Sequence, residues 1–343
     1  MTISHDFFSQ LTQAAPRLFE LLSAFSQVRV LVIGDLALDE FMTGEVERVS
    51  REAPVMILRH ESTRQVPGCG ANSVCNFASL GASVQAAGFI GNDDQGRAIQ
   101  RLFAEQIVNT DGIFVDGDRP TVTKTRISGH ARQSVTQQMV RVDRKSDALP
   151  SLALQQKLVN YIQQQIHQVD CVVCSDYGDG TMTAPVIEVA LAHHRVIVDA
   201  QKDLHRFAGA TVFTPNVPEA EKAVGYAIAD EASLHRAGNE LLSQTKADMV
   251  LITRGGDGMT FFSKTGNNQS IPAFNRTDVF DVTGAGDTVT AALTLALGAG
   301  ASIWEAAVLG NLAASIVVRE FGTATTTVTA MRQALSALLM DQS

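Results

Sequence analysis

The chain contains few cysteines and few charged residues, and each shortage excludes a class of protein. Four cysteines lie unevenly among 343 residues, too few for the disulfide framework of a secreted domain, so we expect a reducing, cytoplasmic location. Acidic residues outnumber Lys and Arg by 36 to 27, which gives a net charge of −9. Because no block of basic residues interrupts this acidic background, we expect no nucleic acid among the main partners.

The sequence also lacks a long apolar run. A signal peptide needs a basic region followed by an apolar stretch, whereas the N-terminal residues include His5 and Asp6. The longest stretch without a formal charge, residues 288–304, is broken by Gly298 and Gly300. A buried helix explains this stretch better than a membrane span does. We therefore expect neither export nor contact with a membrane.

Short apolar runs rich in Val and Ile alternate with segments of helical periodicity, such as residues 94–107 and 152–166. Strands of this composition are buried on both faces, so the alternation predicts an α/β fold with a mostly parallel sheet between two layers of helices. At 343 residues, 45% of them hydrophobic, the chain is large enough for one large domain or two ordinary ones. The apolar runs are residues 28–33, 84–90, 171–174, 196–198, 211–213, 249–252 and 259–262.

Two segments depart from this rhythm. Residues 41–66 and 121–143 alternate polar and apolar side chains, which predicts a small antiparallel sheet beside the main one, usable as a lid or a dimer surface. We found no linker and no repeat, so we interpret residues 1–343 as one domain with an inserted lid. An N-terminal helix is predicted within residues 1–27. Apolar residues recur there at multiples of three and four positions and so lie on one face of a helix: Phe8, Leu11, Leu18, Leu22 and Phe25.

Two familiar phosphate-binding signatures are absent. There is no G-x-x-x-x-G-K-[ST], and residues 34–39 after the first strand read G-D-L-A-L-D rather than G-x-G-x-x-G. This argues against a P-loop NTPase and a standard dinucleotide enzyme. Residues 281–287 instead read D-V-T-G-A-G-D and precede helix-forming residues. The glycines permit tight turns that direct successive N–H groups toward an anion at the start of a helix.

Asp287 ends this motif, where a carboxylate would repel a phosphate unless it had a chemical task. We expect the helix N-terminus to favour its ionised form, ready to accept a proton from a substrate hydroxyl that attacks phosphorus. The simpler interpretation is that Asp287 caps the helix, because Asp is a favoured N-cap residue. The motif alone leaves both interpretations open.

Residues 281–287 resemble the C-terminal signature of the ribokinase-like (PfkB) sugar kinases, and the resemblance extends from about Val30 to Thr326. It implies a ribokinase-like three-layer sandwich with a small lid sheet, and transfer of the γ-phosphoryl group of ATP to a sugar hydroxyl. By this resemblance Asp287 is the catalytic base. The anion hole for the transferring group is then formed by Gly284, Ala285 and Gly286.

The resemblance also implies nucleotide and metal sites. Residues 214–219 read T-P-N-V-P-E and are similar to the family motif N-x-x-E, in which Asn216 and Glu219 help to place Mg²⁺ and phosphate, usually through water. Alternatively, Glu219 only favours the first turn of a helix. The family often has a K⁺ site, part of which is matched by Asp281 and Thr283. The positions that match the nucleotide-binding turn and the adenine side are Thr253, Arg254, Gly255, Gly256, Gly258 and Asn311.

The sugar end is expected where open α/β sheets bind ligands, at the carboxyl edge of the first strand. Asp35 and Asp39 lie there, and their carboxylates suit sugar hydroxyls. The family usually has two glycines after the proline of residues 67–76, whereas this chain has Cys69 in the second position. If that glycine has unusual backbone angles, Cys69 changes the hinge, and we expect its thiol to be buried rather than reactive. The resemblance adds Gly68, Asn72 and Asn76 to the sugar site.

Within the family, the chain is similar to kinases that phosphorylate D-glycero-D-manno-heptose 7-phosphate at its anomeric hydroxyl, a step of lipopolysaccharide synthesis. Residues 34–39, 50–55, 120–126, 138–143 and 175–180 carry this resemblance. A substrate that already bears a phosphate needs cations near it, although the same residues could simply form a solvated strand face. The candidate cations are Lys124, Arg126, Arg141 and Lys202.

Two departures keep other substrates open. Residues 199–202 read D-A-Q-K where the heptose kinases usually read D-P-K, and the H-x-G-H motif of a fused nucleotidyltransferase does not occur. The alternatives are a kinase of the same family that acts on a ketose, ribose or a nucleoside, and a catalytically inactive regulator that binds sugar or nucleotide. We expect ATP and Mg²⁺ as cofactors, K⁺ stimulation, and a homodimer in which a partner covers the edges of the lid.

Overall fold

A sheet of nine strands forms the centre of the computed structural model, which describes residues 4–131, 135–275, 279, 281–320 and 322–340. The strands are β1 (Arg29–Gly34), β4 (Ser83–Gly91), β5 (Asn109–Asp116), β8 (Cys171–Asp176), β9 (Val196–Ala200), β10 (Val212–Phe213), β11 (Met249–Thr253), β12 (Met259–Ser263) and β13 (Gln269–Ile271). Their order is β13-β12-β11-β10-β9-β8-β1-β4-β5. All ladders from β5 to β11 are parallel, and β12 and β13 are antiparallel. The predicted, mostly parallel sheet is confirmed.

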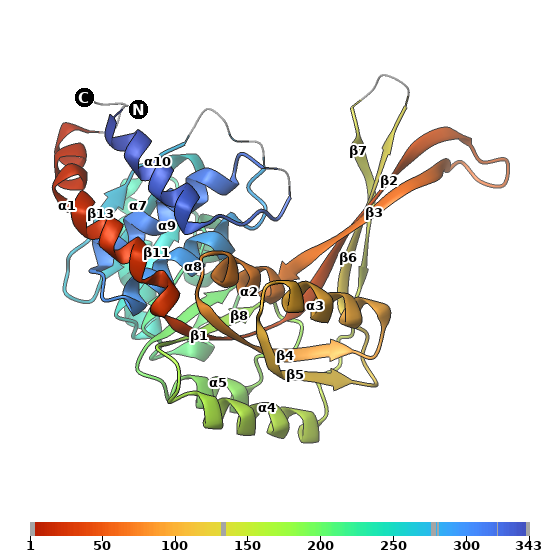
Figure 1. The fold of residues 1–343 in the computed structure, drawn as a ribbon, viewed down its shortest axis with the longest axis horizontal. Coiled ribbons are helices and arrows are strands. Elements are labelled where there is room, and N and C mark those ends of the chain that lie inside the picture. Colours follow the sequence, from red (N-terminus) through yellow and green to blue (C-terminus); the bar gives the residue numbers. More distant parts are fainter. Residues whose placement is uncertain (1–3, 132–134, 276–278, 280, 321, 341–343) are drawn as a thin grey trace.

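Helices cover both faces of this sheet (Figure 1). Side chains alternate along β1, so that Val30 and Val32 enter one core while Leu31 and Ile33 enter the other. The first core is covered by α1 (His5–Ala24), α2 (Gly70–Ser79), α3 (Asp94–Glu105), α8 (Ala285–Gly298), α9 (Ile303–Val317) and α10 (Val328–Met340). The second is covered by α4 (Leu152–Gln165), α5 (Ala184–Ala190), α6 (Val217–Val224) and α7 (Glu231–Thr245).

The predicted N-terminal helix is α1, followed by the short 3₁₀ helix η1 (Phe25–Gln27). Its buried stripe starts at Phe7 rather than at the predicted Phe8, and continues through Leu11, Leu18 and Leu22. Two further 3₁₀ turns are η2 (Leu204–Phe207) and η3 (Gly255–Asp257). Among the described residues, no helix combines the length and apolarity that a membrane crossing requires.

A second sheet projects from the main one (Figure 1) and is called the lid below. It consists of β2 (Leu36–Val49), β3 (Met56–Cys69), β6 (Val122–His130) and β7 (Gln137–Arg144), in the order β3-β2-β6-β7. The β2–β3 and β6–β7 ladders are antiparallel, as predicted. The β2–β6 ladder is parallel, so the prediction of a wholly antiparallel lid is wrong there. The reason is that β2 follows β1 and β6 follows β5, and these two strands run in the same direction. Residues 132–134 of the predicted lid segment lie outside the described residues.

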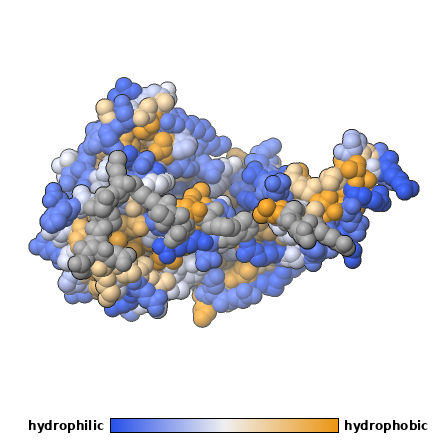
Figure 2. Space-filling model, turned by 90° about the horizontal axis from the view of Figure 1, so that it is seen from above, coloured by the Kyte–Doolittle hydropathy of each residue, from blue (hydrophilic) through white to orange (hydrophobic). Residues whose placement is uncertain are grey.

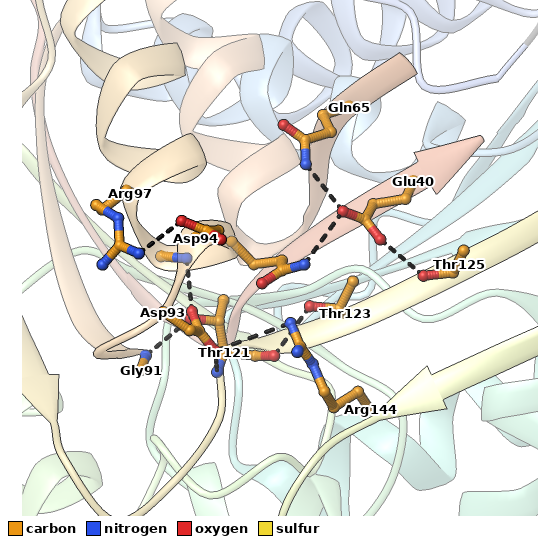
Figure 3. Close-up of polar contacts among 12 residues, drawn as sticks. Glu40, Gln65, Gly91, Asp93, Asp94, Arg97, Thr121, Thr123, Thr125 and Arg144 are labelled. Atoms are coloured by element: carbon orange, nitrogen blue, oxygen red, sulfur yellow. Dashed lines mark hydrogen bonds and ion pairs between the residues drawn. The ribbon is translucent and has the colours of Figure 1, made fainter. Parts of the chain in front are cut away.

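Polar contacts at the base of the lid join its strands to one another and to the main body (Figure 3). Glu40 of β2 accepts a hydrogen bond from the Thr125 hydroxyl of β6 at 2.8 Å. Asp93, the N-cap of α3, accepts hydrogen bonds from the hydroxyl and the amide of Thr121 at 2.6 and 2.9 Å. Arg144 of β7 lies 3.8 Å from the same carboxylate. These contacts fix the base of the lid beside the carboxyl edge of the main sheet.

Candidate active site

Residues from several elements meet around Asp287 in the first turn of α8. Its side chain is 5% exposed. The Asn72 amide of α2 donates a hydrogen bond to Oδ2 at 2.6 Å, and the Tyr177 hydroxyl, just after β8, donates one to Oδ1 at 3.3 Å. The structure therefore brings together two residues that the sequence predicted, Asp287 and Asn72, with one that it did not.

Burial raises the pKa of Asp287 to about 7, although hydrogen bonds from Asn72 and Tyr177 and the charge of Lys124 act in the opposite direction. We expected the helix N-terminus to keep this carboxylate ionised. Removal from water outweighs that effect, so both protonation states are populated near neutral pH. A group with this pKa is well matched to accepting a proton at neutral pH.

The start of α8 excludes the capping interpretation of Asp287. The N-cap of α8 is Gly284, with a φ of +78° that favours glycine. A Cβ at this position would lie 2.8 Å from the Asn72 amide nitrogen. The Ala285 amide donates to the Val282 carbonyl at 3.2 Å. Asp287 therefore lies inside the first turn, and its carboxylate binds side chains rather than the backbone of its own helix.

Lid residues supply the charges on the predicted sugar side. Asp39 of β2 is 4% exposed and lies 3.0 Å from the Arg126 guanidinium of β6. A Cβ at Gly68 would approach the Asp39 carboxylate carbon to 3.0 Å, so the missing side chain makes room for Asp39. Lys124 donates a hydrogen bond to the Cys69 sulfur at 2.9 Å. Four of the predicted sugar-binding residues are thus clustered near Asp287.

Cys69 has the unusual backbone angles expected for the family glycine that it replaces. Its φ is +51° with ψ of −133°, a conformation that strains any residue with a Cβ. Burial raises the pKa of its thiol to about 12, which leaves it protonated at neutral pH. Cys69 is 6% exposed, in line with the prediction of a buried thiol.

Three predicted sugar-binding residues have other contacts in this structure. Asp35 accepts hydrogen bonds from the backbone amides of Tyr177, Asp179 and Thr181 at 2.9–3.0 Å, and so holds the loop that carries Tyr177. Asn76 of α2 accepts a hydrogen bond from the Thr288 hydroxyl of α8 at 2.7 Å, which ties these two helices together.

The third of these residues, Arg141, belongs to β7. Its guanidinium donates to Asp143 at 2.8 Å, and its side chain is 49% exposed. It lies directly opposite Arg126 in the β6–β7 ladder. Lys202 lies outside the lid, where its side chain approaches Gly178 in the loop after β8.

A cleft of about 790 Å³ lies beside the start of α8. Its volume is in the range of small-molecule sites. Asn311 of α9 lines it while donating its amide to the Pro272 carbonyl at 2.7 Å. The other predicted nucleotide residues along this cleft are Asn216, Thr253, Arg254, Gly255, Gly256 and Gly258, and Ala285 and Gly286 of the predicted anion hole also line it.

Asn216 and Glu219 form a capping box at the start of α6. Each side chain accepts a hydrogen bond from the backbone amide of the other at 2.9 Å, so the simpler helix-start interpretation describes real contacts. Burial also raises the pKa of Glu219. At the end of β9, burial together with the charges of Asp287 and Glu219 raises the pKa of Asp199 well above its usual value. A divalent cation would relieve this concentration of negative charge.

Asp281 holds the loop before α8. Its carboxylate accepts hydrogen bonds from the amide and hydroxyl of Thr283 at 2.9 and 2.7 Å, and from the Gly322 amide at 3.0 Å. Although partial burial acts in the opposite direction, these hydrogen bonds hold the pKa of Asp281 below its usual value. Within the described residues, no three His, Cys, Asp or Glu side chains form a ready metal cage.

Comparison with known sequences assigns the chain to a protein family. The sequence model of the pfkB family carbohydrate kinases matches residues 29–330. The chain belongs to the pfkB family of carbohydrate kinases. The kinase is therefore a phosphotransferase with an alcohol as acceptor, and the predicted family and enzyme class are confirmed.

Curated relatives of the kinase include two proteins called bifunctional protein HldE. The one from Desulfatibacillum aliphaticivorans is 42% identical over 94% of this chain and 65% of the relative. The one from Geobacter metallireducens is 41% identical over 87% of this chain and 61% of the relative. The chain therefore spans less than two thirds of the length of these relatives.

Solved structures confirm the predicted ribokinase-like fold. Escherichia coli phosphofructokinase-2 in complex with potassium superposes with a TM-score of 0.72 at 19% identity, covering 91% of this chain and 99% of that one. Arabidopsis thaliana ribokinase complexed with ribose and ATP gives 0.70 at 18% identity, with the same coverage.

Two residues near Asp287 were missed by the sequence analysis. Tyr177 and Asp199 both stand at or just past the carboxyl end of a parallel strand, β8 and β9 respectively. Their position at the ligand-binding edge was a usable signal, because polar residues there converge on one site. The contact of Tyr177 with a residue 110 positions away was not visible in any local pattern.

Proposed function

We propose that the chain transfers the γ-phosphoryl group of ATP to O1 of D-glycero-D-manno-heptose 7-phosphate. The observation that carries this proposal is the pairing of a buried carboxylate of pKa about 7, Asp287, with a lid face that carries Lys124 and Arg126. The first group suits proton transfer from a sugar hydroxyl, and the cations suit a substrate that is already anionic.

The curated relatives support the choice of sugar. Bifunctional HldE proteins, about 40% identical over about 90% of the chain, have a kinase part that acts on heptose 7-phosphate. The identity extends over both the main sheet and the lid. The kinase activity of that part is the activity that we propose for this chain.

The reaction follows from the arrangement of the chain's own residues. ATP lies in the 790 Å³ cleft with its terminal phosphate at the start of α8, where amides of residues 284–286 stabilise the negative charge that develops, that of Ala285 once it leaves the Val282 carbonyl. The acceptor hydroxyl lies against Asp287, which takes its proton as the oxygen forms a bond to the γ-phosphorus. The bond between that phosphorus and the bridging oxygen of ADP breaks. Asn72 holds the base in place throughout.

Mg²⁺ fits the negative charge between the nucleotide cleft and the base. The residues that would hold it are Glu219 and Asp199, through water, because buried carboxylates with raised pKa values gain most from a nearby cation. When bound, Mg²⁺ neutralises charge on the phosphates of ATP.

We also infer K⁺ stimulation, with Asp281 and Thr283 as part of the site. The support is the potassium complex of Escherichia coli phosphofructokinase-2 and the loop geometry around Asp281. Equal turnover in buffers with and without K⁺, both free of Na⁺, would contradict this part of the proposal.

ADP release from Mg-ATP tests the proposed activity. The panel contains heptose 7-phosphate, the unphosphorylated heptose, ribose, a ketose, fructose 6-phosphate and a nucleoside. We expect heptose 7-phosphate to exceed every other acceptor and the new phosphate to lie on the anomeric oxygen by phosphorus NMR. Preference for another acceptor would assign the chain to a different kinase of the family. ATP binding without turnover on any acceptor would indicate the inactive regulator.

A homodimer formed through the lid is a further part of the proposal. Apolar side chains gather on the lid, as the orange areas at the right of Figure 2 indicate. Apolar residues more than 40% exposed include Val49, Met56, Val140 and Val142 of the lid and Val55 of the loop between β2 and β3. A second lid would cover them and the free strand edges. Sedimentation at micromolar concentration should give twice the chain mass of 36.7 kDa, and a monomer there would contradict the dimer.

A further inference from the structure

Tyr177 is the described side chain that contacts the Oδ1 oxygen of Asp287. Its hydroxyl donates to that oxygen at 3.3 Å, whereas Asn72 holds Oδ2 at the shorter distance of 2.6 Å. Each carboxylate oxygen can accept two hydrogen bonds, so Oδ1 keeps a free position for an acceptor hydroxyl. Because the longer bond stabilises Oδ1 less, this oxygen is the more basic of the two.

The phenol of Tyr177 is held in this position by its neighbours. Its backbone amide donates to Asp35 at 2.9 Å, and the Lys124 ammonium lies 5.3 Å from the centre of its ring. Burial and the adjacent charge of Asp287 raise the pKa of Tyr177 well above its usual value. The phenol therefore remains a hydrogen-bond donor throughout the pH range in which Asp287 titrates.

We propose that Tyr177 is a positioning residue for phosphoryl transfer, whose hydroxyl aims Oδ1 of Asp287 at the acceptor hydroxyl and stabilises the ionised carboxylate. This inference rests on the proposed role of Asp287 as the base. It goes beyond that role because it assigns the proton to one oxygen and names the group that sets its basicity.

Other ionisable groups near Asp287 also influence its pKa, and a test of Tyr177 must leave them unchanged. Asp39 of β2 raises its pKa, and Lys124 of β6 lowers it. Asp199 of β9 is close enough to be affected by its charge, and Cys69 of β3 is close as well. None of these groups is removed when only the Tyr177 hydroxyl is deleted, so a change in the titration of Asp287 reports that hydroxyl.

The test is the pH dependence of kcat/KM from pH 5.5 to 9 with saturating Mg-ATP and the best acceptor, for wild type, Tyr177→Phe and Tyr161→Phe. Tyr161 of α4 is the matched control, because its hydroxyl lies 3.5 Å from Gln85 and not near the site. We expect Tyr177→Phe to move the midpoint of the acidic limb upward by about 0.5–1 pH unit. At pH 7 its kcat/KM should fall about two- to fivefold, with an unchanged KM for ATP, and Tyr161→Phe should match wild type.

A second variant tests the same hydroxyl in the opposite direction. Fluorotyrosine at position 177 has a more acidic phenol, which is a stronger donor, so the midpoint should move downward. A merely structural role would lower kcat equally at all pH values in both variants. An unmoved midpoint in Tyr177→Phe would therefore overturn the inference.

Asp287→Asn, assayed in parallel, separates this inference from the proposed function. If Asp287→Asn retains wild-type turnover, Asp287 is not the base and both proposals fall. If Asp287→Asn is inactive while Tyr177→Phe keeps the wild-type pH profile, only the role of Tyr177 is wrong.

Discussion

The two halves of the candidate site, the predicted nucleotide half and the predicted sugar half, differ in the kinds of residue that form them. The predicted nucleotide half is a cleft whose lining combines glycine turns, such as Gly255 and Gly256, with apolar side chains, such as Leu234 and Phe274. The predicted sugar half is a partly buried cluster of ionisable groups, from the lid and from the carboxyl edge of the sheet, that includes Asp39, Lys124 and Arg126.

This difference indicates that the two halves of the site contribute differently to nucleotide binding and to recognition of the acceptor. Backbone amides and glycine turns bind phosphates in any sequence that can adopt the turn, so a family can keep the nucleotide half while its acceptors change. The sugar half depends on side-chain charge, and its groups perturb one another. Substitutions in the sugar half should therefore change acceptor use and pH dependence, whereas those in the nucleotide half should change only ATP binding.

The largest effect is expected from Asp287→Asn. Loss of a general base should lower kcat by about 10²–10⁴-fold, while the KM for ATP stays within about twofold. Asp94→Asn, in an exposed pair with Arg97, is the matched control and should behave as wild type. A kcat within tenfold of wild type for Asp287→Asn would remove the proposed division of tasks.

The free energy of unfolding should depend on pH, because the ionised form of the buried Asp287 destabilises the folded protein. The pKa of Asp287 is raised to about 7 in the folded state, so the folded protein holds a proton that the unfolded chain has released between about pH 4 and 7. The free energy of unfolding therefore falls as pH rises through that window. Asp287→Asn, which does not titrate, should be more stable than wild type at pH 8 by on the order of 3 kcal/mol, with little difference at pH 4. Urea unfolding at both pH values checks this, and an equal difference at both would contradict it.

A smaller effect is expected at the lid cations. Arg126→Ala removes a partly buried charge beside Asp39 and should raise the KM for a phosphorylated sugar about 10–30-fold, with the KM for ATP unchanged. Arg141→Ala, half exposed and paired with Asp143, should change either KM less than about threefold. Steady-state kinetics with each substrate varied in turn checks this. Equal losses in the two variants would show that the lid acts by charge alone and not through the buried pair.

The smallest effect concerns the nucleotide half. Gly255 has a φ of +56°, whereas the neighbouring Gly256 has an ordinary conformation, and both would have open space around a Cβ. Gly255→Ala should raise the KM for ATP about fivefold through backbone strain, and Gly256→Ala should leave it nearly unchanged. Neither should alter the KM for the sugar. A change in the KM for the sugar in either variant would contradict the separation of the two halves.

Local patterns predicted the main sheet and the phosphate motif, because burial on both faces and glycine turns appear directly in the sequence. They did not predict the parallel β2–β6 ladder, which depends on two distant strands leaving the same edge of the sheet. The raised pKa of Asp287 depends on burial by other elements. Asp35 and Asn76 are predicted sugar-binding residues, and their contacts with the loop after β8 and with α8 are visible only in the folded chain.

The most direct test of the central claim is the ratio of kcat/KM for heptose 7-phosphate to that for the unphosphorylated heptose, in wild type and in Arg126→Ala. If the lid face binds a phosphorylated sugar, the wild-type ratio should exceed about 100, and Arg126→Ala should lower it about tenfold or more. A wild-type ratio near one would contradict the account, because the charged sugar half would then have no phosphate to recognise.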